Sequence, residues 1–348
     1  MRRTFIFALM VSCLLSSPAG FACRLEGMMG LKNPSDANIK EEEQFLHTVL
    51  LSDPNSLQQE SAKRPPKDGV HENLDLEDLS GILRKYGSPD GWGIASYACP
   101  TTSLQIPKVI RGVAPAYQDN HFKQAVIQPE HAHTSIFLAH VRLASLTAKE
   151  VELQNVHPFT FKNWSFMHNG EVSGAFSPVV TNKIAQFKEQ LAGGPKGATD
   201  SERVFYFFLA NLYETTGTLD SQHVPLETLQ KVFSRTITTL IENSTPTAKV
   251  IPKNVLGVEG HLQMQPACNF VLTDGEHVFA YRKVLNLYLA QKTLSTKQKV
   301  YLIASEQTQK QDASVQWLLL PENHLLTLYW DENGNPRPRL EPVMPFTH

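Results

Sequence analysis

Two amphipathic segments in the middle of the chain, flanked on both sides by apolar strand patterns, constrain the fold more than any other feature. Residues 202–213 carry apolar side chains at helical spacing, and Asp200 or Ser201 is expected to cap this helix. Residues 226–242 predict a second helix of similar quality. Strands are predicted at residues 92–97, 135–141, 164–167, 268–273, 277–282, 300–305 and 324–329. This order of strands, paired helices and strands indicates sheets covered by helices, which is an α+β fold.

The remaining segments are less regular. Residues 41–51 predict a helix with acidic residues at its start, where the helix dipole favours them. Residues 52–90 are polar and interrupted by proline, and they predict a long surface loop with one short helix near residues 76–86. The His-Asn-Gly sequence at 168–170 predicts a turn after the third strand. Neither an internal repeat nor a Pro- or Ser-rich linker divides the chain, so we expect one domain.

The N-terminus has the pattern of a secretory signal peptide. A basic head at residues 1–3 precedes an apolar run at residues 5–15, and small residues follow up to Ala22. Cleavage after Ala22 would leave a domain of residues 23–348 that begins with Cys23. No stretch reaches the roughly 18 apolar residues of a membrane-spanning helix. We therefore expect an exported protein, periplasmic or secreted, with no transmembrane segment.

Cys23 at the cleavage point permits a second interpretation, because bacterial lipoproteins are acylated on such a cysteine. The preceding Gly-Phe-Ala lacks the usual leucine and favours a free cysteine instead. Export would leave Cys99 and Cys268 in an oxidising compartment. We expect these two residues to form a disulfide and Cys23 to remain free. The alternative is three unpaired thiols, two of them buried, and the sequence does not decide between the two.

Composition excludes several classes of partner. Lys and Arg total 32 against 34 Asp and Glu, which gives a net charge of -2 and no basic surplus for nucleic acid. No glycine-rich phosphate loop is present, so ATP is not expected. The histidines, including His131 and His133, have no zinc-site spacing. We expect no cofactor and no metal.

As the first residue of a processed chain, Cys23 would combine two useful groups. Its thiol has an ordinary pKa of about 8.5, and the α-amine on the same residue has an ordinary pKa of about 8. The amine can therefore act as general base for the thiol, directly or through one water molecule. This is the chemistry of N-terminal nucleophile hydrolases, and it needs no separate catalytic histidine.

Five motifs in order along the chain resemble the class II glutamine amidotransferases, the family of N-terminal-cysteine glutaminases. The similarity is greatest to stand-alone bacterial members such as the ergothioneine-pathway amidohydrolases. The motifs lie at residues 23–25, 56–61 with 90–95, 138–142, 155–170 and 199–202. The resemblance implies a four-layer αββα sandwich of largely antiparallel sheets. It also implies that Cys23 is the nucleophile, with Asn169 and the Gly170 backbone N–H as donors to the oxyanion.

The same resemblance implies a substrate clamp. Arg142 resembles the residue that binds a substrate α-carboxylate, which a guanidinium can grip through two hydrogen bonds. Asp200 resembles the residue that receives an α-ammonium, and His168 is placed in the substrate-binding set. The alternatives are a structural ion pair for Arg142 and a helix cap for Asp200. An Arg and an Asp at opposite ends of an amino acid head group predict a small γ-glutamyl substrate.

The function predicted is hydrolysis of glutamine or another γ-glutamyl amide, with release of ammonia or an amine. We expect no synthase domain, because the resemblance uses most of the chain, and exported compartments lack ATP for amide transfer. One alternative is a secreted Cys amidase of the bile-salt and penicillin type, which does not explain Arg142 together with Asp200. Another is a lipid-anchored binding module without catalysis.

Overall fold

The computed structural model describes residues 23–62, 87–99, 105–127, 134–143, 151–251 and 260–343. The helices are α1 (Asp36–His47), α2 (Leu57–Ala62), α4 (Asn120–Ile127), α5 (Pro178–Gln186), α6 (Asp200–Thr216) and α7 (Leu226–Glu242), and a π-helical turn at Thr48–Ser52 extends α1. The expected signal peptide at 1–22, the helix near 76–86 and His131 with His133 lie outside these residues. None of the described helices is long and apolar enough to cross a membrane.

Two antiparallel sheets form the centre of the molecule. Their strands run in the orders β13-β11-β12-β1-β4-β2-β3 and β15-β14-β10-β9-β6-β5, and β7 and β8 pair as a separate hairpin. The strands of the first sheet are β1 (Arg24–Met29), β2 (Trp92–Ala98), β3 (Lys108–Gly112), β4 (Thr134–Val141), β11 (Tyr288–Thr293), β12 (Lys299–Ala304) and β13 (Val315–Leu319). The others are β5 (Phe159–Phe161), β6 (Trp164–Glu171), β7 (Thr247–Ile251), β8 (Gly260–Met264), β9 (Ala267–Thr273), β10 (Val278–Tyr281), β14 (His324–Trp330) and β15 (Pro336–Pro342).

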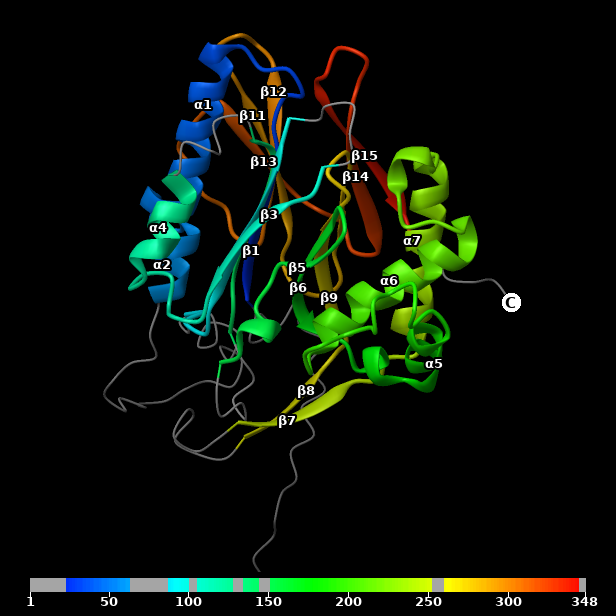
Figure 1. Ribbon diagram of the computed structural model, residues 1–348. Helices are drawn as coiled ribbons and strands as arrows, with labels where there is room; N and C mark the ends of the chain where they lie inside the picture. The colour runs from blue at the N-terminus through cyan, green and yellow to red at the C-terminus, as the bar shows by residue number, and fades with distance from the viewer. Residues whose placement is uncertain are drawn as a thin grey trace, which may run out of the picture.

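Three buried clusters show that the layers are stacked helix, sheet, sheet, helix (Figure 1). One cluster, which includes Phe45 and Phe122, fills the space between the first sheet and α1, α2 and α4. A second cluster packs Phe208 and Phe233 of α6 and α7 against the other sheet. The third cluster lies between the two sheets. The α+β class and the four-layer αββα arrangement expected from the sequence are therefore confirmed.

The predicted helices that fall within the described residues are present with adjusted ends. Helix α7 has the predicted bounds, whereas α6 begins at Asp200 and continues to Thr216. Its N-cap is Thr199, whose hydroxyl accepts a hydrogen bond from the backbone N–H of Glu202, so the expectation that Asp200 or Ser201 caps this helix is wrong. Helix α2 lies inside the segment that was predicted to be a loop.

The His-Asn-Gly sequence does not form the predicted turn. Strand β6 continues through Glu171 and pairs with β9, with Asn169 opposite Asn269. Gly170 makes this continuation possible because its φ is +131°, and a Cβ at this position would collide with the carbonyl oxygen of Ala267. The Asn-Gly pair therefore places Asn169 on a strand.

The three described cysteines are free thiols. Cys268 is buried on the helix-facing side of β9, and Cys99 follows β2 in the other sheet. The expectation of a disulfide between Cys99 and Cys268 is therefore wrong. All three thiols are unpaired, as in the alternative, but only Cys268 is buried.

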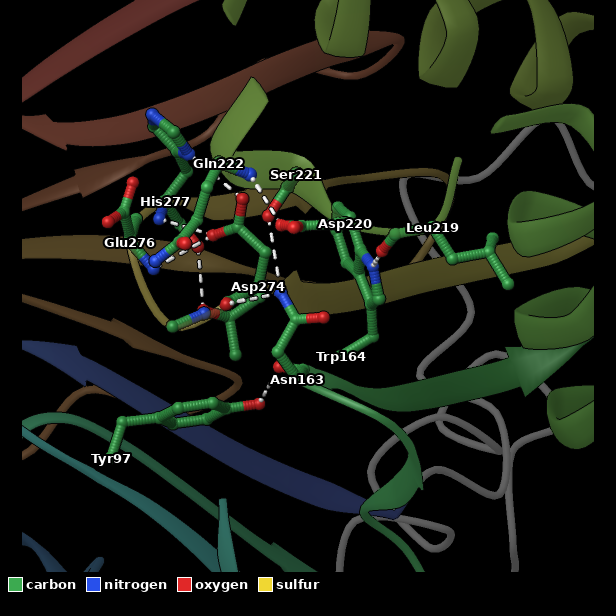
Figure 2. Close-up of polar contacts among 12 residues, drawn as sticks. Tyr97, Asn163, Trp164, Leu219, Asp220, Ser221, Gln222, Asp274, Glu276 and His277 are labelled. Carbon is green, nitrogen blue, oxygen red and sulfur yellow. Dashed lines mark hydrogen bonds and ion pairs between the residues drawn. The ribbon is translucent and has the colours of Figure 1, made fainter. Parts of the chain in front are cut away.

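A polar network fastens the two sheets together at the end where β6 begins (Figure 2). The Tyr97 hydroxyl of β2 lies 2.8 Å from the carbonyl oxygen of Asn163 and 2.6 Å from the Ser165 hydroxyl, so it connects the first sheet to the second. The Asn163 amide donates to the carbonyl oxygen of Asp274 at 2.9 Å. The network thereby joins β2, the start of β6 and the turn after β9.

Candidate active site

Cys23 immediately precedes β1, which lies in the middle of the first sheet. Successive side chains of a strand point to opposite faces, and Leu25 and Met29 belong to the cluster between the sheets. Cys23 shares their alternation and therefore faces the space between the sheets. Arg24 lies on the helix side, where it forms an ion pair with Glu60 of α2.

The Cys23 thiol is held against the end of β4. The backbone N–H of Leu143 donates to Sγ at 3.2 Å. Burial raises the pKa of the Cys23 thiol, and the Leu143 N–H and the positive charges of Arg142 and Arg24 oppose this increase. Because burial is the largest of these effects, the thiol needs a base before it can attack a carbonyl.

Arg142 directly follows β4, and two backbone hydrogen bonds hold its main chain in place. Its backbone N–H donates to the carbonyl oxygen of Gly91 at 2.8 Å, and its carbonyl oxygen accepts from the N–H of Asp90 at 2.9 Å. By contrast, its Nη1 is buried and has no hydrogen-bond partner in the described part of the chain. The charge of Arg142 lowers the pKa values of Cys23 and His140, so the guanidinium lies close to both.

Two buried imidazoles lie beside Arg142. The ring centroids of His140 and His157 are 4.2 Å apart. Burial lowers the pKa of His140 to about 3, and burial together with the His140 charge lowers the pKa of His157 well below its usual value. Both rings are therefore neutral at physiological pH. The carbonyl oxygen of His157 approaches Gly93 so closely that a Cβ there would collide with it.

Asn169 brings an amide to the same space from the other sheet. It has the same alternation along β6 as Met167, which belongs to the cluster between the sheets. Its Oδ1 is buried and lacks a hydrogen-bond partner among the described residues. The Asn169 side chain opposes the decrease in the pKa of His140, so the two side chains are neighbours. The structure thus brings Cys23, Arg142 and Asn169 into one region.

His168 faces the opposite side of β6. Its ring stacks with that of Phe166, and its Nδ1 lies 2.9 Å from the hydroxyl oxygen of Ser201 in α6. Asp200 lies near the end of β6, where its carboxylate accepts the backbone N–H of Val172 at 2.9 Å. The predicted pair of His168 and Asp200 therefore meets at the start of α6, with Ser201 between them.

Sequence reasoning assigned no function to Ser201, His140 or His157. All three lie inside the motifs at 138–142, 155–170 and 199–202, so their position in those motifs was a usable signal. No group of three potential metal ligands occurs within the described residues.

The amino-acid sequence is similar to that of known proteins. Residues 78–240 match the family described as class II glutamine amidotransferases. The chain is 27% identical over 294 residues to a protein of Saccharomyces cerevisiae named as a probable glutamine amidotransferase, DUG3, and the match covers 76% of each chain. It is 28% identical over 215 residues to YafJ of Escherichia coli, also named as a glutamine amidotransferase, covering 58% of this chain and 66% of YafJ.

Two of the solved structures that align with the chain have related names. A glutamine aminotransferase class-II domain protein from Silicibacter pomeroyi aligns with a TM-score of 0.47 and 19% identity, covering 92% of this chain and 100% of that one. The glutamine phosphoribosylpyrophosphate amidotransferase of B. subtilis aligns with a TM-score of 0.49 and 13% identity, covering 92% of this chain and 49% of that one. On the sequence matches, the chain carries a class II glutamine amidotransferase domain, and this family consists of enzymes that act on the carbon–nitrogen bond of an amide.

Proposed function

We propose that the protein is an exported N-terminal-nucleophile amidohydrolase that hydrolyses glutamine or another γ-glutamyl amide. One observation carries this proposal: the Cys23 thiol lies next to Arg142, whose buried Nη1 has no hydrogen-bond partner in the described chain. A buried guanidinium nitrogen without a partner is unfavourable. A substrate carboxylate bound there would supply the missing acceptor and hold the substrate beside the nucleophile.

The proposed reaction begins with removal of residues 1–22, which frees the α-amine of Cys23. The amine takes the thiol proton, and the sulfur attacks the δ-carbonyl carbon of the substrate. The resulting oxyanion accepts hydrogen bonds from the Asn169 amide and the Gly170 N–H. The protonated amine then gives its proton to the leaving nitrogen, and water hydrolyses the Cys23 thioester to release glutamate.

The remaining groups would recognise the head of the substrate. Arg142 binds the α-carboxylate, and Asp200 accepts a hydrogen bond from the α-ammonium. Because His140 and His157 are neutral, they add no positive charge beside Arg142. We propose hydrolysis rather than amide transfer because a protein exported to the periplasm or secreted would have no ATP to drive synthesis.

The test is an incubation of the processed protein with a panel of γ-glutamyl amides, read as released glutamate. The proposal expects release with the wild-type protein and none with Cys23→Ala. Intact-mass analysis of the same sample identifies its N-terminus. A diacylglycerol adduct on Cys23, or no glutamate from any member of the panel, would contradict the proposal.

A further inference from the structure

A chain of hydrogen bonds joins β6 to the carboxylate of Asp200. His168 Nδ1 lies 2.9 Å from Ser201 Oγ, and this hydroxyl donates to Asp200 Oδ1 at 3.3 Å. His168 is 1% exposed and Ser201 is 5% exposed, so water does not compete readily for these bonds. The three side chains therefore act as one connected unit behind the strand that carries Asn169.

The direction of each hydrogen bond follows from the chemistry of the groups. A carboxylate only accepts, and a serine hydroxyl has a single hydrogen. Because that hydrogen goes to Asp200, the Nδ1 of His168 must donate its own hydrogen to Ser201. Burial lowers the pKa of His168, with the Asp200 charge and the Ala267 backbone opposing, which agrees with a neutral ring. A neutral ring carries one hydrogen, and the bond to Ser201 places it on Nδ1.

The same bonds occupy most of the Asp200 carboxylate. Its Oδ1 accepts from the Ser201 N–H at 2.8 Å as well as from the hydroxyl, and its Oδ2 accepts from the Val172 N–H at 2.9 Å. A carboxylate offers about four acceptor sites. One site therefore remains, on Oδ2, and the bonds to Oδ1 fix the rotation of the carboxylate that determines where this site points.

We propose that His168 and Ser201 are positioning residues that orient the Asp200 carboxylate and so determine selectivity for ligands with an α-ammonium group. This inference rests on the proposed function, in which Asp200 receives that group. It replaces the expected direct contact between His168 and the substrate with an indirect role. Asn169 and His168 are adjacent on β6, so one strand would serve the oxyanion on one face and head-group recognition on the other.

The experiment compares L-glutamate with glutarate, which has the same two carboxylates and no ammonium group. Binding is measured by calorimetry to purified protein carrying Cys23→Ala, because this variant cannot turn over. Adding Ser201→Ala should weaken glutamate binding about tenfold, the usual effect of losing one hydrogen bond to a charged group. Glutarate binding should change by less than about twofold. An equal loss for both ligands, or no loss for either, would overturn the inference.

Variants of His168 test the same point with Ser201 in place. His168→Asn keeps an N–H donor near the position of Nδ1 and should retain the preference for glutamate, whereas His168→Phe keeps the ring without the donor and should lose it. Ser135→Ala is a matched control, since Ser135 is also buried and its hydroxyl donates to the Ala98 carbonyl oxygen at 3.0 Å, far from this site. It should preserve the preference.

The outcomes separate this inference from the proposed function. If wild-type protein releases no glutamate from γ-glutamyl amides, the proposed function fails. If it does release glutamate, and Ser201→Ala and His168→Phe both keep the parent's preference for glutamate over glutarate, only the positioning role fails. A parent protein that binds neither ligand would overturn both.

Discussion

Arg142 differs from Arg24, the other arginine beside the nucleophile, in the contacts of its backbone and its guanidinium. Its backbone is hydrogen-bonded on both sides, to Gly91 and Asp90, whereas its buried Nη1 has no partner among the described residues. Arg24, by contrast, forms ion pairs with Glu60 and Glu306. An arginine whose main chain is fixed and whose buried Nη1 lacks an acceptor is suited to bind an anionic ligand.

Substitution of Arg142 tests this role. Arg142→Lys keeps the charge but loses the planar pair of donors, so kcat/KM for glutamine should fall about tenfold or more, mainly through a higher KM. Steady-state glutamate release measures both parameters. Arg337→Lys, on the exposed edge strand β15, is the matched control and should behave as wild type. An unchanged KM in Arg142→Lys would contradict the proposed carboxylate contact.

Asn169 is expected to act on the chemical step instead. Asn169→Ala removes one donor to the oxyanion, so kcat should fall by about 10²–10³ while glutamate still binds. Asn163→Ala is a useful contrast, because Asn163 precedes the same strand and its amide bonds to the Asp274 carbonyl oxygen and the Ser221 hydroxyl. That variant should lose stability and keep its turnover. Similar kinetic losses in both variants would indicate a general structural effect.

At the scale of elements, the helices were easier to predict than the strands. Periodicity was enough for α7, because its buried residues recur at helical spacing. Strand β1 was not predicted, since its apolar residues alternate with Arg24 and Glu26, two charged residues that are nonetheless buried in the structure. The His-Asn-Gly sequence was misread as a turn because an Asn-Gly pair is common in turns, and only pairing with β9 shows its place in a strand.

The turn between β9 and β10 holds a titratable pair at the far end of the sheets (Figure 2). His277 Nδ1 lies 3.0 Å from Asp274 Oδ2. Burial lowers the pKa of His277, but the charge and the hydrogen bond of Asp274, together with the charge of Glu276, outweigh burial and raise this pKa. A group whose pKa is higher in the folded state stabilises the fold below its unfolded pKa, and this contribution is lost as the pH rises through the folded pKa.

His277→Gln should therefore reduce the free energy of unfolding more at about pH 6 than at about pH 9. The measurement is urea unfolding of both proteins at the two pH values, compared as a difference so that other titrating groups cancel. His121→Gln is the matched control, because His121 also pairs with an aspartate but its side chain is 82% exposed. A difference that is the same at both pH values would exclude the ion pair as its cause.

Across the whole molecule, the resemblance of the five motifs to the family predicted which segments of the chain meet at the site. Cys23 precedes β1, Arg142 follows β4 and Asn169 lies on β6. These strands belong to two different sheets, and the three residues face one interlayer region. The orientation of His168 could not be predicted, because the face to which a strand residue points depends on its register. The contact between Ser201 and His168 could not be predicted either, because it depends on how α6 packs against β6.

The central claim is that Cys23 is a nucleophile activated by its own α-amine. The most direct measurement is the rate of glutamate release by two matched proteins, one beginning at Cys23 and one that retains Ala22 before it. The account predicts turnover by the first protein and almost none by the second, because an amide nitrogen cannot accept the thiol proton. Equal rates for the two proteins, or turnover that survives Cys23→Ala, would contradict it.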